Sequence, residues 1–130
     1  GMLTGVWKYY QIRHSELARA HYYVDIAHRS SLLYAAASLI LAVLASFTIL
    51  PDMVVLVCVI ANLLFFAMSV LIYTIHGMLK DTTNQFKQPH QLGRFTLPTW
   101  CMSLMMLSLI IVELGATTIL MLGTIFKFLT

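Results

Sequence analysis

The chain has 130 residues, of which 60% are hydrophobic and 10% are charged. Soluble domains carry about 25% charged residues, so this composition excludes an ordinary soluble domain and indicates one integral membrane domain over residues 1–130. We attribute the formal net charge of +3 to a membrane edge, where basic residues contact anionic lipid, and not to a nucleic acid partner.

The segment over residues 6–29 predicts an amphipathic helix that precedes the first membrane span. Its tyrosine and tryptophan rings suit the headgroup region of a bilayer. Asp25 and Arg29 are spaced i,i+4 in the order that favours an ion pair on a helix. Because no glycine or proline occurs in residues 6–50, we expect one long helix there.

Three apolar stretches are long enough to cross a bilayer core of roughly 30 Å, which takes about twenty helical residues. They lie at residues 31–50, 53–75 and 99–126. Pro51 suits the start of a new helix, and residues 80–98 form a polar segment with several turn-forming residues. The sequence therefore predicts an all-α, three-span transmembrane helical bundle with a long amphipathic N-terminal helical extension.

Lysine and arginine are distributed unevenly around these spans. Every one except Lys127 lies either before the first span or between the second and third, and the turn at Pro51 has none nearby. The positive-inside rule then places the N-terminus and the long loop in the cytoplasm, together with all five histidines. We expect a multi-pass protein of a bacterial inner membrane.

Three of the histidines, His14, His21 and His28, follow one another at intervals of seven residues. On one continuous helix they would form a stripe along one face. Neutral imidazole is a common ligand of metals and haem iron. His21 and His28 cannot bind opposite faces of one haem from the same helix face, so a second ligand would be His76 or come from another subunit. The alternative is that these histidines are polar residues tolerated where water is available.

Two polar residues lie inside the predicted spans, Asn62 in the second and Glu113 in the third. An ionisable residue at that depth is a functional candidate. In the structural alternative, a protonated Glu113 bonds to Asn62 or to a neighbouring subunit. Sulfur side chains over residues 101–106 would suit Cu(I), although methionine in a span is more often an apolar filler. The polar segment 80–98 could cover a pocket mouth or simply be solvated.

Three short motifs resemble the styrene oxide isomerase family: Ala18-Arg19-Ala20-His21, the span asparagine Asn62, and Asn84-Gln85-Phe86. Members of that family are small membrane proteins that bind haem b between the subunits of a trimer. They isomerise an epoxide to an aldehyde, with ferric haem as the Lewis acid. The resemblance covers most of residues 18–126 and implies that His21 is the axial haem ligand.

The chain also departs from that family. The catalytic asparagine of the family would fall at Ala27, and its aspartate and tyrosine around the span asparagine would fall near Cys58 and Phe66. The segment before the first span is amphipathic here, where the family has an additional span. The resemblance therefore implies the fold and the haem site without the isomerase chemistry, and His28 and His76 have no family counterpart.

Two hypotheses follow from the sequence. In the first, the chain is a homo-oligomer, a trimer by the resemblance, that binds haem b through His21 at a subunit interface, with His28, His76 and Asn62 as further cofactor-binding candidates. Its chemistry would be isomerase-like or redox chemistry on a small hydrophobic molecule, with no catalytic residue assigned. In the second, it is a non-enzymatic helical membrane protein that binds a transition metal through histidines or has a structural or partner-binding role.

Overall fold

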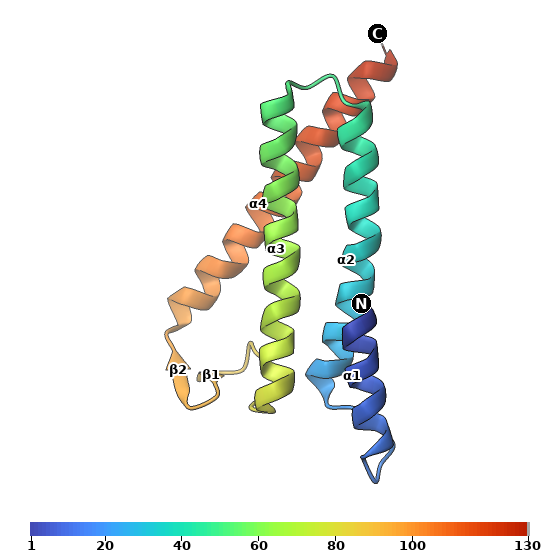
Figure 1. Ribbon diagram of the computed structural model, residues 1–130. Coiled ribbons are helices and arrows are strands. Elements are labelled where there is room, and N and C mark those ends of the chain that lie inside the picture. Colours follow the sequence, from blue (N-terminus) through green and yellow to red (C-terminus); the bar gives the residue numbers. More distant parts are fainter. Residues whose placement is uncertain (130) are drawn as a thin grey trace.

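The computed structural model describes residues 1–129, and these form four helices and one β-hairpin (Figure 1). The elements are α1 (Met2–Arg13), α2 (Tyr22–Phe47), α3 (Asp52–Leu79), β1 (His90–Leu92), β2 (Phe95–Leu97) and α4 (Thr99–Leu129). Helices α2, α3 and α4 are each long and apolar enough to cross a bilayer. The chain is thus an all-α, multi-pass membrane protein, as predicted, and the last residue of the predicted 1–130 domain lies outside the described residues.

The single long helix predicted over residues 6–50 is wrong. Helix α1 ends at Arg13, and the chain reverses direction before α2 begins at Tyr22 (Figure 1). In this reversal Ala18 adopts the left-handed conformation, with φ of 49°. No helix-breaking residue marks the position, so contacts made after the reversal must outweigh local helix propensity.

Those contacts join α1 to the first turns of α2 in an antiparallel pair. The Lys8 ammonium forms an ion pair with the Asp25 carboxylate, which also lies 3.6 Å from the Arg29 guanidinium in the predicted i,i+4 arrangement. The Gln11 side chain accepts a hydrogen bond of 2.9 Å from the backbone N–H of His21. Helix α1 therefore braces the start of α2 instead of extending it.

The break also removes the predicted histidine stripe. His14 caps the C-terminus of α1, and its Nδ1 donates to the backbone oxygen of Tyr10 at 2.9 Å. His21 caps the N-terminus of α2, and only His28 lies within a helix. The seven-residue spacing therefore does not place the three imidazoles on one helix face.

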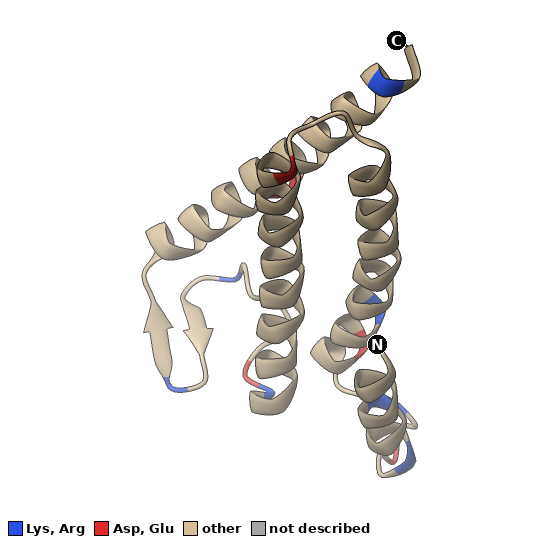
Figure 2. Ribbon diagram, turned by 45° about the horizontal axis from the view of Figure 1, so that its top comes forward, with Lys and Arg blue, Asp and Glu red and all other residues tan. Residues whose placement is uncertain are grey.

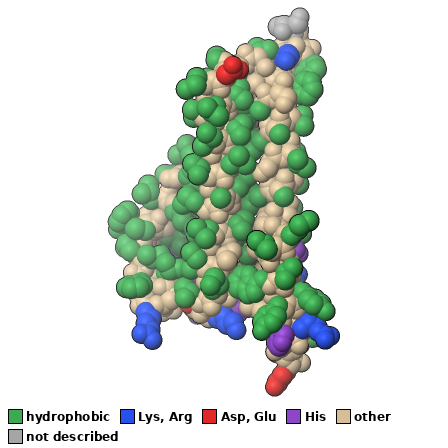
Figure 3. Space-filling view, in the orientation of Figure 1, with side chains coloured by type: hydrophobic (Ala, Val, Ile, Leu, Met, Phe, Trp, Pro, Cys, Tyr) green, Lys and Arg blue, Asp and Glu red, His purple; other side chains and the backbone are tan. Residues whose placement is uncertain are grey.

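The three long helices share a small apolar core, and most of their other apolar side chains face outward (Figure 3). Leu41, Cys58, Ala116 and Leu120 are buried together where α2, α3 and α4 meet. In Figure 1, α4 crosses the other two helices obliquely, so its first half diverges from α3. Residues 80–98, including the hairpin, connect the two helices on that side.

Every lysine and arginine except Lys127 belongs to one end of the bundle (Figure 2). We call this the histidine end: α1, the link to α2, the first turns of α2, the last turn of α3 and residues 80–98. All five histidines belong to these segments, as the sequence predicted. The opposite end, which we call the turn end, contains the connection 48–51 and the last turns of α4.

Candidate functional site

Buried polar side chains tie residues 80–98 to α2 and α3 at the histidine end. We call this set the polar latch, and it comprises Tyr23, His76, Asp81, Gln85 and His90. Buried polar groups are costly unless they are hydrogen-bonded. The hydrogen bonds of the latch therefore hold the loop in a defined position instead of leaving it solvated.

Asp81 is the centre of one half of the latch. Its Oδ1 accepts from Nδ1 of His76 at 2.8 Å, and its Oδ2 accepts from the backbone N–H of Gly93 at 2.7 Å. Burial alone would raise the pKa of this carboxyl, but the hydrogen bonds from Gly93 and His76 reverse the effect and lower the pKa. Asp81 is thus an ionised group that joins the end of α3 to the hairpin turn.

Gln85 is the centre of the other half. Its backbone N–H donates to the hydroxyl of Tyr23 at 2.7 Å, and its backbone oxygen accepts from Nδ1 of His90 at 3.0 Å. The Tyr23 ring in turn packs against the His76 ring, with centroids 5.1 Å apart. Both halves of the latch therefore meet at Tyr23 and His76.

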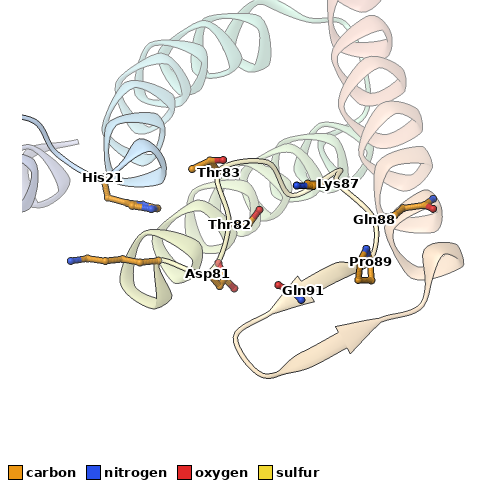
Figure 4. Close-up of a pocket in the computed structure, with 9 residues that line it drawn as sticks. His21, Asp81, Thr82, Thr83, Lys87, Gln88, Pro89 and Gln91 are labelled. Atoms are coloured by element: carbon orange, nitrogen blue, oxygen red, sulfur yellow. The ribbon is translucent and has the colours of Figure 1, made fainter.

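His21 lies at the edge of the latch and lines a hollow of about 480 Å³ between the start of α2 and the loop (Figure 4). Most of the other lining residues are polar or charged, two of them lysines, and the set consists of Lys80, Asp81, Thr82, Thr83, Lys87, Gln88, Pro89 and Gln91. His21 also lines a second hollow of about 590 Å³ on the side of α1. Its partly exposed imidazole therefore stands between two open spaces.

The electrostatic surroundings of His21 favour a neutral imidazole. Partial burial and the nearby Lys80 ammonium lower the pKa of His21, and the Asp81 carboxylate opposes them only in part. A neutral imidazole is the form that ligates metals. His21 is therefore in the correct charge state for a ligand at neutral pH.

The tautomer of His21 is a separate matter. Nδ1 accepts a hydrogen bond of 3.4 Å from the backbone N–H of Tyr23, which puts the proton of the neutral ring on Nε2. Ligation of iron through Nε2 needs that proton on Nδ1. At 3.4 Å the contact between Tyr23 and Nδ1 is long for a hydrogen bond. If it breaks, the proton can move to Nδ1, and Nε2 is then free to bind iron.

The structure does not bring the other predicted cofactor residues to His21. His28 faces the N-terminus of α1, and its Nδ1 lies 3.2 Å from the backbone oxygen of Gly1. The side chain of His76 is 4% exposed and is held by Asp81. Asn62 lies fourteen residues before His76 on α3, about 21 Å along the helix. Neither hollow lined by His21 includes any of these three.

Among residues 1–129, no three histidine, cysteine, aspartate or glutamate side chains gather as a metal-binding group. The loop-side hollow is lined by one imidazole, that of His21, whereas His14 and His21 both line the α1-side hollow. A single imidazole is the one protein ligand of five-coordinate haem iron. The described residues do not offer a set of three or four ligands of the kind that a structural zinc site uses.

The intramembrane pair predicted from the sequence is also rearranged. Asn62 is fully buried, with its Nδ2 donating to the Cys58 oxygen at 3.0 Å and its Oδ1 accepting from Thr117 at 3.2 Å. The hydrogen bond to Asn62, one form of the structural alternative for Glu113, is absent among the described residues. Glu113 Oε1 is buried without a hydrogen-bond partner in the described part of the chain.

Sequence reasoning missed most of the latch. The sequence predicts Tyr23 as an interfacial aromatic residue and places Asp81, Gln85 and His90 in a polar loop. The hairpin could have been found, because Gly93 and Arg94 form a two-residue turn between short strands, and Gly93 has the positive φ of 61° that favours glycine.

Comparison of this chain with protein-family models, with curated proteins and with solved structures gives no match.

Proposed function

We propose that this chain binds haem b at a membrane edge, with His21 as the axial iron ligand that each chain supplies. The observation that supports it best is the placement of His21: a neutral, partly exposed imidazole at a braced helix start, between two open hollows. The motif resemblance points to the same residue. When bound, haem would supply Lewis-acid or redox chemistry for a small hydrophobic molecule.

The charges around His21 suit the acidic groups of such a cofactor. Lys80 and Lys87 line the hollow on the loop side, and Arg19 lines the one on the α1 side. Haem b carries two propionates, and lysine and arginine are the usual partners of carboxylates. The polar wall of the loop-side hollow would hold the propionate edge while the imidazole holds the iron.

An oligomer fits this site better than a single chain does. Three spans in so short a chain enclose little volume, and His21 faces hollows that one chain leaves open. Long rows of apolar side chains on α2, α3 and α4 face outward, where lipid or a second copy can cover them. We propose a homo-oligomer, and a trimer on the strength of the resemblance.

The orientation is part of the proposal. Lysine and arginine are concentrated at the histidine end, so the positive-inside rule puts that end in the cytoplasm. The haem would then lie at the cytoplasmic side of a bacterial inner membrane. A cysteine at position 52 should react with an impermeant reagent from outside, and a cysteine at position 95, where Phe95 is 76% exposed, should not. The reverse pattern would overturn the orientation.

The haem proposal is tested by expression with an ample haem supply, followed by the absorption spectrum of the purified protein. Wild type should show a Soret band, and His21→Ala should lose it. His14→Ala is the matched control, because His14 lines the α1-side hollow but lies at the end of the other helix. His28→Ala and His76→Ala should keep the band position, since neither residue lines a hollow with His21. Wild type without haem, or His21→Ala with an unchanged band, would overturn the proposal.

A further inference from the structure

A second cavity lies within the bundle, where α4 diverges from α3. Its volume is about 140 Å³, and aromatic and methionine side chains of α2, α3 and α4 form most of its wall. Phe65 and Tyr73 come from α3, and Met105 and Met106 come from α4. Its loop side is formed by Gln85 and Phe86. The cavity shares no lining residue with the two hollows of His21.

Gln85 lines this cavity, and its side chain carries one buried polar atom without a partner. The residue is 8% exposed, and its Oε1 is buried with no hydrogen-bond partner among residues 1–129. Such an atom is rare in folded proteins and needs an explanation. The polar latch holds the backbone of Gln85 on both sides, through Tyr23 and His90, so the residue stays beside the cavity.

We propose that this cavity binds a small apolar molecule, about one aromatic ring in size, and that the Gln85 amide turns toward it so that the molecule donates one hydrogen bond to Oε1. An apolar cavity of about 150 Å³ is known to accept one benzene molecule, so the volume sets the size of the ligand. The oxygen is an acceptor, so the ligand carries a hydroxyl or an N–H group. A phenol has this chemistry.

The ligand reaches the cavity from the lipid. Met68 and Phe86 line the cavity and are 46% and 52% exposed on the outer surface. A molecule dissolved in the bilayer therefore meets these two flexible side chains first. Because the cavity is separate from His21, the site is present without haem, and its test does not depend on the haem proposal.

The experiment uses 4-fluorophenol and 4-fluorotoluene with the purified, haem-free protein in detergent, followed by ¹⁹F NMR. The two probes have nearly the same shape, but only the phenol has a donor. Wild type should bind the phenol saturably beyond its partitioning into empty micelles, and should bind it more tightly than the toluene. No saturable binding of either probe would overturn the proposal.

Two variants separate the hydrogen bond from the cavity. Gln85→Leu should weaken phenol binding by about 2- to 10-fold, the worth of one hydrogen bond, and should leave toluene binding unchanged or tighter. Met106→Trp should fill the cavity and abolish binding of both probes. Met121→Trp is its matched control, because Met121 lies on the same helix with a 47% exposed side chain and does not line the cavity. Phenol binding that survives in Gln85→Leu at wild-type strength, or in Met106→Trp, would contradict the site.

Discussion

The two ends of the bundle are closed in opposite ways. At the turn end, α2 and α3 are joined by the short connection 48–51, which packs directly on α4. The backbone N–H of Ile49 donates to the oxygen of Gly123 at 3.2 Å, and glycine is needed because a Cβ there would lie 2.2 Å from Oγ1 of Thr48. At the histidine end, a much longer segment is closed by buried hydrogen bonds between side chains and backbone.

This difference separates the two ends by the polar groups that they offer to a ligand. The turn end has an open hollow of about 430 Å³ beside the connection, and no histidine, lysine or arginine of residues 1–129 lines it. The histidine end contains the polar latch, both hollows of His21 and, just inside it, the apolar cavity at Gln85. Loops that carry function are commonly positioned by a rigid scaffold. Here the latch makes the loop part of that scaffold.

The largest effect on stability is expected from removing the centre of the latch. Asp81→Leu leaves the N–H groups of His76 and Gly93 without their acceptor, and each such buried loss costs about 1–3 kcal/mol. The free energy of unfolding in detergent should therefore fall by about 2 kcal/mol or more. Glu16→Gln, an exposed acidic residue of the same end, should change it by less than about 0.5 kcal/mol. Equal stability of Asp81→Leu and wild type would show that the loop is not held by this carboxylate.

At the turn end, stability should depend on side-chain volume and not on buried hydrogen bonds. Gly123→Ala places a methyl group into Thr48 and Leu50, and such overpacking typically costs about 1–3 kcal/mol. Gly115→Ala is the control on the same helix, because no heavy atom lies within 4 Å of its added Cβ. That change should be neutral or should stabilise by up to about 1 kcal/mol through helix propensity. If Gly123→Ala and Gly115→Ala change the free energy of unfolding by the same amount, tight packing at the turn end is not what stabilises it.

The smallest effect is expected from pH, and only at the histidine end. The pKa of His21 is lower in the folded chain than its ordinary value of 6.5, so the unfolded chain binds the proton more readily. Stability should therefore decrease slightly as pH falls below about 6.5, and His21→Gln should remove part of this decrease. The pKa of Asp81 is also lowered in the folded chain, so protonation of this carboxyl should reduce stability further, but only at more acidic pH. Hydrogen exchange should report the change near residues 21–25 and not near 48–51.

The spans could be predicted from sequence because hydropathy over twenty residues is a local property, and α2, α3 and α4 follow it. The reversal after Arg13 could not, because it depends on Lys8 meeting Asp25 and on Gln11 meeting His21, contacts that exist only after the chain has turned. The latch depends on a hydrogen bond between residues 23 and 85, which are 62 positions apart.

The candidate site was predictable only in part. The motif resemblance singles out His21, and His21 lines a hollow together with Lys80 and Lys87. The seven-residue histidine spacing suggested a stripe that the structure does not contain, because spacing has geometric meaning only within one helix. The sequence places Gln85 in a polar loop and in a short motif, and nothing in its neighbourhood shows that its side chain lies buried against apolar helices.

The most direct test of the haem proposal is chemical rescue of His21→Gly. Glycine keeps the backbone N–H that donates a hydrogen bond to the Gln11 side chain, and it leaves space where the imidazole stood. The purified variant should lack the wild-type Soret band when supplied with haem, and added free imidazole should restore the band at its wild-type position. A variant that shows the wild-type band without imidazole, or a wild-type protein that never takes up haem, would contradict iron ligation by His21.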